Sequence, residues 1–254
     1  MVTERTVTED ADADAAMVAG GPRPSSRVPL DRARIVAAAL EFIDDKGLPG
    51  LTMRRLGAEL GVEAMALYRH VPGKEDLLDA VVTSLADRMG EDDEVRLEAQ
   101  DGWQDFVQRM AHGVRRVALE HPKAFPLIAS RPPEAPWLRP PLRSLDWVEA
   151  FLSALVEEGF TDEAAVAGYR AFTSFLLGHL LLEASTHGAD VGPLDVLDYG
   201  AGGAPDQDAH PTVLRLRDGL SQDRAAAEFE EALEELLGRI GLIRTEALED
   251  SAGD

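Results

Sequence analysis

Apolar residues recur along most of the chain at spacings of three and four, the pattern of amphipathic helices. The periodicity starts at Ile35 and continues to Ile243, with interruptions at glycine and proline. No useful length of sequence alternates between apolar and polar residues as a strand does, and no internal repeat is visible. The pattern therefore predicts an all-α protein.

The N-terminal part of the pattern predicts short helices separated by turn residues. Asp31 is placed to cap the first helix, which ends before the glycine- and proline-containing turn 47–50. Thr52 is placed to cap the second, which Gly61 ends. A third runs through Tyr68 to Val71. After Pro72-Gly73 a fourth helix carries Leu77, Leu78, Val81, Val82 and Leu85.

The longer C-terminal part predicts larger helices. One begins at Trp103 and stops near His121-Pro122, and another lies within 142–156. The helix at 162–186 is apolar nearly all round, so we expect it to be buried on every side. Residues 187–211 are rich in glycine, aspartate and proline and predict a loop, and the last helix spans 222–243.

These elements predict four segments. Residues 1–29 form a disordered arm, 30–75 a small helical unit, 76–247 a larger helical domain and 248–254 a tail.

The composition narrows the class of protein. The chain has 254 residues, 45% of them apolar, and no cysteine, which excludes a disulfide scaffold, a cysteine zinc site and a thiol nucleophile. No run approaches the ~20 apolar residues of a membrane span, and the first 20 residues do not resemble a signal peptide. We therefore expect a cytoplasmic protein.

The net charge of −22 is unevenly distributed. Residues 27–76 hold eight basic and eight acidic side chains, so the excess of acid lies outside this segment. If this negative charge were spread evenly over the chain, the protein would repel nucleic acid. The whole-chain charge therefore does not exclude DNA binding by the N-terminal unit.

Residues 52–71 have the spacing of a helix-turn-helix. Gly57 allows two helices to cross closely, and Gly61 can adopt the left-handed turn conformation. Val62, Leu67 and Val71 can hold the second helix in place, and that helix would enter the major groove. By spacing alone, an ordinary helical hairpin with a glycine turn is an equal alternative.

Longer motifs favour DNA binding. Residues 30–85 closely resemble the DNA-binding domain of the TetR family of transcriptional repressors. The matching strings are Arg34–Phe42, Gly50–Thr52, Leu56–Val62 and Leu67–Leu78. The C-terminal part resembles the tetracycline-repressor subgroup in Ala129–Pro132, Glu158–Thr161 and Phe172–Glu183. The resemblance covers about residues 30–185, and the last helix fits in pattern only.

The resemblance implies a set of DNA-binding residues. They are Thr52, Arg54, Ala64, Met65, Tyr68, Arg69, His70 and Lys74. Tyr68, His70 and Lys74 fall on positions that contact phosphate in the family, although packing in the core is an alternative for Tyr68. Of Arg54 and Arg55, we expect only Arg54 to face DNA.

The recognition helix departs from the family at Ala64, Met65 and Ala66. Family members often have polar residues there that read base edges, whereas these side chains can touch only thymine methyl groups. Sequence could instead be read by Arg54, by Arg69 or through DNA shape.

The resemblance also implies a small-molecule pocket in the larger domain. The candidate lining residues are Trp103, Phe106, Met110, Leu127, Ile128, Arg131, Trp147, Phe151, Phe172, Phe175, His179 and Glu183. Ordinary core packing is the alternative for most of the aromatic residues.

A metal is not expected in this pocket. Leu127 matches a histidine that binds the magnesium of the drug in tetracycline repressors, although Glu183 falls at an acidic position of that site. We therefore expect a largely apolar effector rather than tetracycline–magnesium. His179, Glu183 and His187 share a helical face, but a polar lining is preferred to a metal site, and no cofactor is expected.

The resemblance further implies a homodimer, formed by the helices near 162–186 and 222–243 as a four-helix bundle. The predicted function is a repressor that a small effector releases from a palindromic DNA operator. A ligand-responsive activator and a ligand-independent helix-turn-helix protein remain alternatives. No motif of a catalytic triad, phosphate loop or metal hydrolase is present, so the chain is not expected to be an enzyme.

Overall fold

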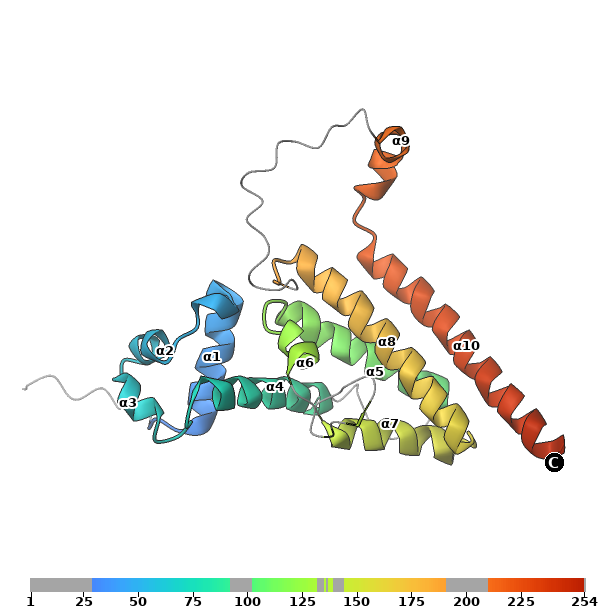
Figure 1. The fold of residues 1–254 in the computed structure, drawn as a ribbon, viewed down its shortest axis with the longest axis horizontal. Coiled ribbons are helices and arrows are strands. Elements are labelled where there is room, and N and C mark those ends of the chain that lie inside the picture. Colours follow the sequence, from blue (N-terminus) through green and yellow to red (C-terminus); the bar gives the residue numbers. More distant parts are fainter. Residues whose placement is uncertain are drawn as a thin grey trace, which may run out of the picture. The chain divides into compact units, whose positions relative to one another are not determined.

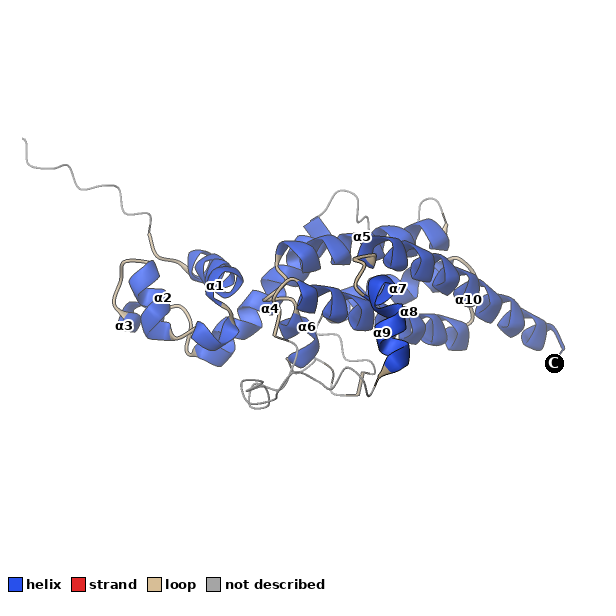
Figure 2. Ribbon diagram, turned by 90° about the horizontal axis from the view of Figure 1, so that it is seen from above, coloured by secondary structure: helices blue, strands red, loops and turns tan. Residues whose placement is uncertain are grey.

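A computed structural model describes residues 29–91, 102–131, 135, 137–138, 144–190 and 210–253. These residues form helices and connecting turns without any strand (Figures 1 and 2), which confirms the all-α prediction. Residues 1–28 of the predicted arm and 191–209 of the predicted loop lie outside the described residues. The described residues from Asp31 onward belong to one packed unit.

The N-terminal helices begin at the expected capping residues. They are α1 (Arg32–Lys46), a 3-10 turn η1 (Leu48–Gly50), α2 (Met53–Glu59), α3 (Ala64–Leu67) and α4 (Lys74–Glu91). The Asp31 carboxylate accepts a hydrogen bond from the backbone N–H of Arg34 at 2.8 Å. The Thr52 hydroxyl accepts one from the N–H of Arg55 at 3.2 Å. Each bond satisfies an N–H that the first helical turn leaves without a partner.

The third helix is shorter than predicted. α3 ends at Leu67, and Tyr68 to His70 form a turn in which the N–H groups of His70 and Val71 bond to the Leu67 carbonyl at 2.9 and 3.0 Å. Pro72 lacks an N–H and disfavours the helical conformation of Val71, so the helix does not continue beyond this turn. Leu67 and Val71 are fully buried and fix this turn on the rest of the unit.

α4 belongs to both parts of the fold. Its buried residues Leu77, Val81 and Leu85 contribute to the core, and the helix packs against α1, α5 and α6. The boundary predicted between residues 75 and 76 therefore falls inside a continuous helix.

Six helices follow α4 within the described part of the chain. They are α5 (Trp103–Glu120), α6 (Pro126–Ser130), α7 (Leu145–Glu157), α8 (Asp162–Thr186), α9 (Pro211–Leu220) and α10 (Ala225–Gly253). α9 lies where no helix was expected. α10 starts later than the predicted residue 222 and continues to Gly253, so the predicted tail is largely helical.

The prediction that α8 is buried on every side is wrong. One face, which includes Gly168, Phe172 and Leu180, packs into the core against α5, α7 and α10 (Figure 1). The opposite stripe is exposed, with Val166 39% and Leu182 70% accessible. α8 has the length and the mean hydropathy, 1.3, of a membrane span, yet its packing is that of a central helix in a globular domain.

Candidate functional site

The crossing of α2 and α3 depends on Gly57. A Cβ atom at this position would lie 2.9 Å from the Val62 carbonyl oxygen and 3.2 Å from the Ala64 nitrogen. Gly61 has φ +68°, a left-handed conformation that side chains rarely adopt. The two glycines bring the start of α3 against α2, as the helix-turn-helix spacing predicts.

The predicted DNA-binding residues form an exposed surface on α2, α3 and the following turn. Thr52, Arg54, Arg69 and His70 are exposed, and Lys74 at the start of α4 is half-buried. Tyr68 is 43% accessible and Met65 70%, while Ala64 is half-buried. The exposure of Tyr68 favours the phosphate contact over the alternative of core packing.

Arg54 and Arg55 are both exposed, but they differ in their contacts within the chain. Arg55 donates from Nη1 to the Gly50 carbonyl at 2.8 Å and lies over the Phe42 ring at 5.2 Å. Lys46 lies over the same ring at 4.8 Å and pairs with Glu59. Arg55 therefore holds η1 against α1. Arg54 is exposed on the neighbouring position of α2.

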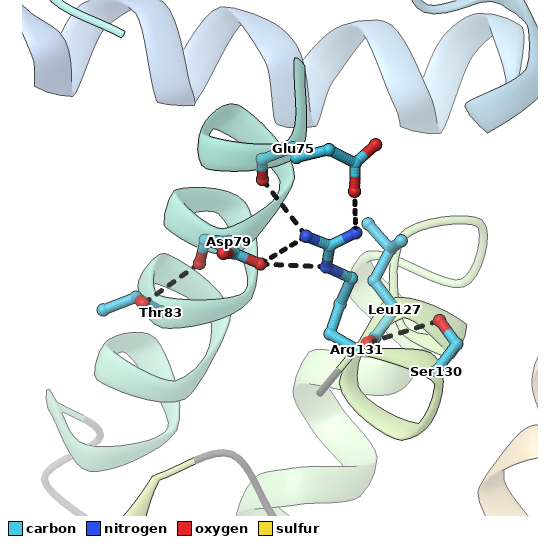
Figure 3. A network of polar contacts seen from close by, with 6 residues as sticks. All are labelled: Glu75, Asp79, Thr83, Leu127, Ser130 and Arg131. Atoms are coloured by element: carbon cyan, nitrogen blue, oxygen red, sulfur yellow. Dashed lines mark hydrogen bonds and ion pairs between the residues drawn. The ribbon is translucent and has the colours of Figure 1, made fainter. Parts of the chain in front are cut away.

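Arg131 connects α6 to the helix that starts at the DNA-binding surface. Its Nε and Nη2 atoms donate to Asp79 at 2.9 and 2.6 Å, and Nη1 donates to Glu75 at 2.5 Å (Figure 3). The hydrogen bond to Glu75 is the main reason that the pKa of Arg131 is raised. The sequence assigned Arg131 to the ligand pocket, whereas the structure places it in this link between helices.

A second polar cluster joins α1, α4 and the end of α5. His121 Nδ1 lies 2.6 Å from Asp44, and Arg88 Nη1 lies 3.3 Å from His121 Nε2. Because arginine has no acceptor, the Arg88 contact makes Nε2 the acceptor and leaves the Nδ1 hydrogen to Asp44. Burial raises the pKa of Asp44, and its bond to His121 partly opposes that shift.

The larger helices line an apolar pocket that spans about 660 Å³ together with its opening to solvent, of which about 60 Å³ admits the centre of a water-sized molecule. Side chains from α4, α5, α6, α7 and α8 line it. They are Val82, Ala86, Met89, Met110, Val114, Ile128, Ser144, Trp147, Phe151, Tyr169, Phe172, Thr173, Leu176 and Leu177. Ser144, Tyr169 and Thr173 bring hydroxyl groups and Trp147 brings an indole N–H, and burial raises the pKa of the Tyr169 phenol.

Five predicted ligand residues, Met110, Ile128, Trp147, Phe151 and Phe172, line this pocket. The structure places the other apolar candidates in the surrounding core, where periodicity cannot distinguish them from lining residues. Trp103 packs edge-on against Phe160, Phe106 packs against Phe151, and Leu127 is only 3% exposed.

The remaining candidates form a separate cluster around Phe229, which anchors the start of α10. The rings of Phe175 and His179 lie 5.9 and 5.3 Å from that of Phe229. Glu183 pairs with Arg115 at 2.5 Å, and the Arg115 guanidinium lies 5.0 Å from the Phe229 ring. Within the described ranges no three histidine, aspartate or glutamate side chains are placed to hold a metal ion.

Sequence reasoning missed the contribution of α4 to the pocket. Val82, Ala86 and Met89 recur at intervals of four and three on α4, and this helical face could have been read from the sequence as part of the larger domain. Tyr169, Thr173 and Leu176 lie within one turn of Phe172 on α8 and were recoverable from it.

Comparisons with known families match both parts of the chain. Residues 35–81 match the model described as bacterial regulatory proteins, tetR family. Residues 97–240 match the model of the tetracyclin repressor-like C-terminal domain.

Individual proteins agree with these matches. The class D tetracycline repressor of Escherichia coli is 30% identical over 226 residues, covering 89% of this chain and 95% of that protein. The HTH-type transcriptional repressor DrrR1 of Streptomyces coeruleorubidus is 34% identical over 62% of this chain and 54% of its own. The Streptomyces coelicolor TetR family protein ActR, solved in complex with actinorhodin, superposes with a TM-score of 0.61 at 25% identity, covering 84% and 95% of the two chains.

Proteins of this kind bind operator DNA through the helix-turn-helix, dimerise, and bind small effectors in the C-terminal domain; they are regulators and not enzymes. The geometry described above has the same division between an exposed surface on α2 and α3 and an enclosed apolar pocket. The chain belongs to the TetR family of transcriptional regulators.

Proposed function

We propose that the chain acts in the cytoplasm as a homodimeric repressor that a small, largely apolar effector releases from a palindromic operator. The observation that carries this proposal is the position of α4. Lys74 begins this helix beside the exposed surface of α3, and Val82, Ala86 and Met89 of the same helix line the pocket. A ligand that shifts the pocket end of a rigid helix also shifts its DNA-contacting end.

The chemistry of the pocket supports an apolar effector. Most of its lining is aliphatic or aromatic, and its polar side-chain groups are hydroxyl groups and the indole N–H of Trp147 rather than charged groups. Leu127 has no metal-binding atom, so tetracycline–magnesium is not the proposed ligand. ActR, the relative whose structure contains actinorhodin, supports an organic molecule as the class of effector.

The exposed faces of α8 and α10 support dimerisation. The exposed stripe of α8 carries Val166, Arg170, Ser174, Gly178 and Leu182 at intervals of four, and Gly238 and Leu242 are exposed on the adjacent α10. A Cβ at Gly178 or Gly238 would meet no atom within 4 Å. Small residues beside exposed leucines allow a second pair of helices to approach closely and bury the apolar stripe.

The DNA-binding assignment is tested with Tyr68→Ala and Lys74→Ala. Each removes a phosphate donor, so we expect at least a tenfold loss of affinity for the DNA upstream of its own gene, with a shallower salt dependence. Arg215→Ala on exposed α9 is the matched control, since it removes a cation away from α2 and α3. Retained affinity in both variants, with the dimer intact by light scattering, would refute the assigned surface.

Release by an effector is tested with a library of uncharged aromatic compounds. A ligand of the pocket raises the melting temperature, and in a repressor it also lowers DNA affinity, because it binds the two states with different affinities. A compound that raises the melting temperature and strengthens DNA binding would favour the alternative of an activator. If no pocket-binding compound changes DNA affinity, the ligand-independent alternative stands.

A further inference from the structure

The helix that faces the major groove has unusual surface chemistry for a DNA-reading element. α3 presents Ala64, Met65 and Ala66, and none of these side chains carries a nitrogen or oxygen atom. Glu63 before them is exposed and carries only acceptor oxygens at neutral pH. α3 therefore cannot donate a side-chain hydrogen bond to a base.

Met65 is the large side chain that the turn exposes most. It is 70% accessible, whereas Leu67 two positions later is fully buried and makes the contact that fixes α3. Met65 therefore does not pack in the core of this chain, and core packing does not explain why this residue is apolar. Single exposed apolar side chains are common on protein surfaces, so what distinguishes Met65 is its place at the centre of α3 rather than its exposure alone.

The residues around Met65 are those of a surface that approaches a polyanion. Arg54, Arg69 and His70 are exposed on the neighbouring turns, and Tyr68 presents its ring and hydroxyl at 43% accessibility. These donors suit phosphate oxygens, which position a protein on the duplex without reading its sequence. With these donors on the phosphates, the apolar side chains of α3 are the groups left to meet the base edges.

The major groove offers one apolar group, the C5-methyl of thymine. We infer that Met65, between Ala64 and Ala66, reads thymine methyl groups, so that the operator carries thymine beneath each copy of α3. This inference rests on the proposed function and adds the class of base that the operator must contain. The flexible thioether side chain packs on the methyl group, and the two alanines leave room for it.

The test uses DNA that the full-length protein itself selects from a randomised 30-base-pair pool. The selected operator is resynthesised with deoxyuridine in place of thymine, one symmetric pair of positions at a time, which removes only the methyl group. Burial of one such group corresponds to about a fourfold change in affinity, so substitution in both half-sites is expected to weaken binding about fifteenfold. Methylated cytosine at the same position is expected to restore part of the affinity.

Variants of Met65 assign the effect to this side chain. Met65→Ala is expected to bind the thymine operator as weakly as the wild type binds the deoxyuridine operator, and to be insensitive to that replacement. Met65→Gln keeps the length of the side chain but adds an amide, so it is expected to lose the methyl preference as well. Val213 is an exposed apolar residue of α9, so Val213→Ala is the control and is expected to keep the preference for the thymine methyl group.

The outcomes separate the inference from the function on which it rests. Binding to no DNA of any sequence would refute both. A defined operator whose affinity does not change with deoxyuridine, or a Met65→Ala protein that remains sensitive to it, would overturn methyl readout and leave the repressor intact. Tight binding without any selected sequence would also overturn it.

Discussion

The DNA-binding surface and the effector pocket are built in opposite ways. The surface comes from Thr52–Lys74, a short continuous stretch whose functional side chains are exposed and whose shape depends on two glycines. The pocket comes from five helices between Val82 and Leu177, and its functional side chains also form the core. Substitution of an exposed side chain on the DNA-binding surface should therefore lower DNA affinity alone. Substitution of a side chain in the pocket should lower the stability of the fold as well.

The largest effect is expected at the centre of the pocket. Phe151→Ala removes a ring that contacts Phe106, Tyr169 and Phe172, and such truncations of a buried phenylalanine cost about 3–5 kcal/mol. Chemical denaturation measures the loss. Trp147→Ala, at a half-buried lining position, should cost clearly less while also enlarging the pocket. Equal losses in the two variants would mean that half-buried lining residues contribute as much to stability as core residues do.

A smaller loss is expected at the crossing of α2 and α3. Gly57→Ala forces a Cβ against the Val62 carbonyl, so we expect a loss of about 1–3 kcal/mol and weaker DNA binding because α3 is displaced. Gly219→Ala is the control, because that position in α9 is open and alanine favours helix. Wild-type DNA affinity in Gly57→Ala would show that the close crossing is not needed for the surface.

Arg131 links α6 to α4, so its substitution should affect the coupling between ligand binding and DNA binding more than the stability of the fold. Arg131→Gln removes the ion pairs with Glu75 and Asp79, whose carboxylates are largely or partly exposed, so only about 1 kcal/mol should be lost. The change in DNA affinity caused by a pocket-binding compound should shrink in this variant, as measured by titration with and without the compound. An unchanged effect of the ligand on DNA affinity would show that Arg131 does not contribute to the coupling.

The smallest effect concerns pH. Burial raises the pKa of Asp44 above the ordinary aspartate value of 3.8. The folded state therefore binds a proton at this carboxylate more readily than the unfolded state does. The contribution of Asp44 to stability therefore falls as pH rises from 3.8 through the raised pKa, and stays lower at neutral pH.

Asp44→Asn keeps an acceptor for His121 and removes this titration. Its stability relative to the wild type should increase with pH across that window, as followed by thermal melting at a series of pH values. A difference between the two proteins that does not depend on pH would show that Asp44 titrates alike in both states. Asp45→Asn, at an exposed neighbour, is the control.

Much of the fold follows from local sequence signals. Asp31 and Thr52 cap the helices that they were expected to cap, and Gly57 and Gly61 make the turn that their spacing predicts. The candidate DNA-binding residues were named from the resemblance to the TetR family, which was readable because its motifs lie in one short continuous stretch of sequence. α9 and the extension of α10 to Gly253 escaped prediction, since their apolar pattern is weak or continues past the expected end.

The sequence by itself determined the helical class, the positions of the caps and turns, and the residues that α3 can present to DNA, because interactions between near neighbours fix all of these. Only the tertiary structure decided which aromatic side chains line the pocket, that Arg131 binds α4 rather than a ligand, and that one stripe of α8 is exposed. These depend on which faces of distant helices meet. A periodic apolar pattern shows that a face is buried but does not show against what.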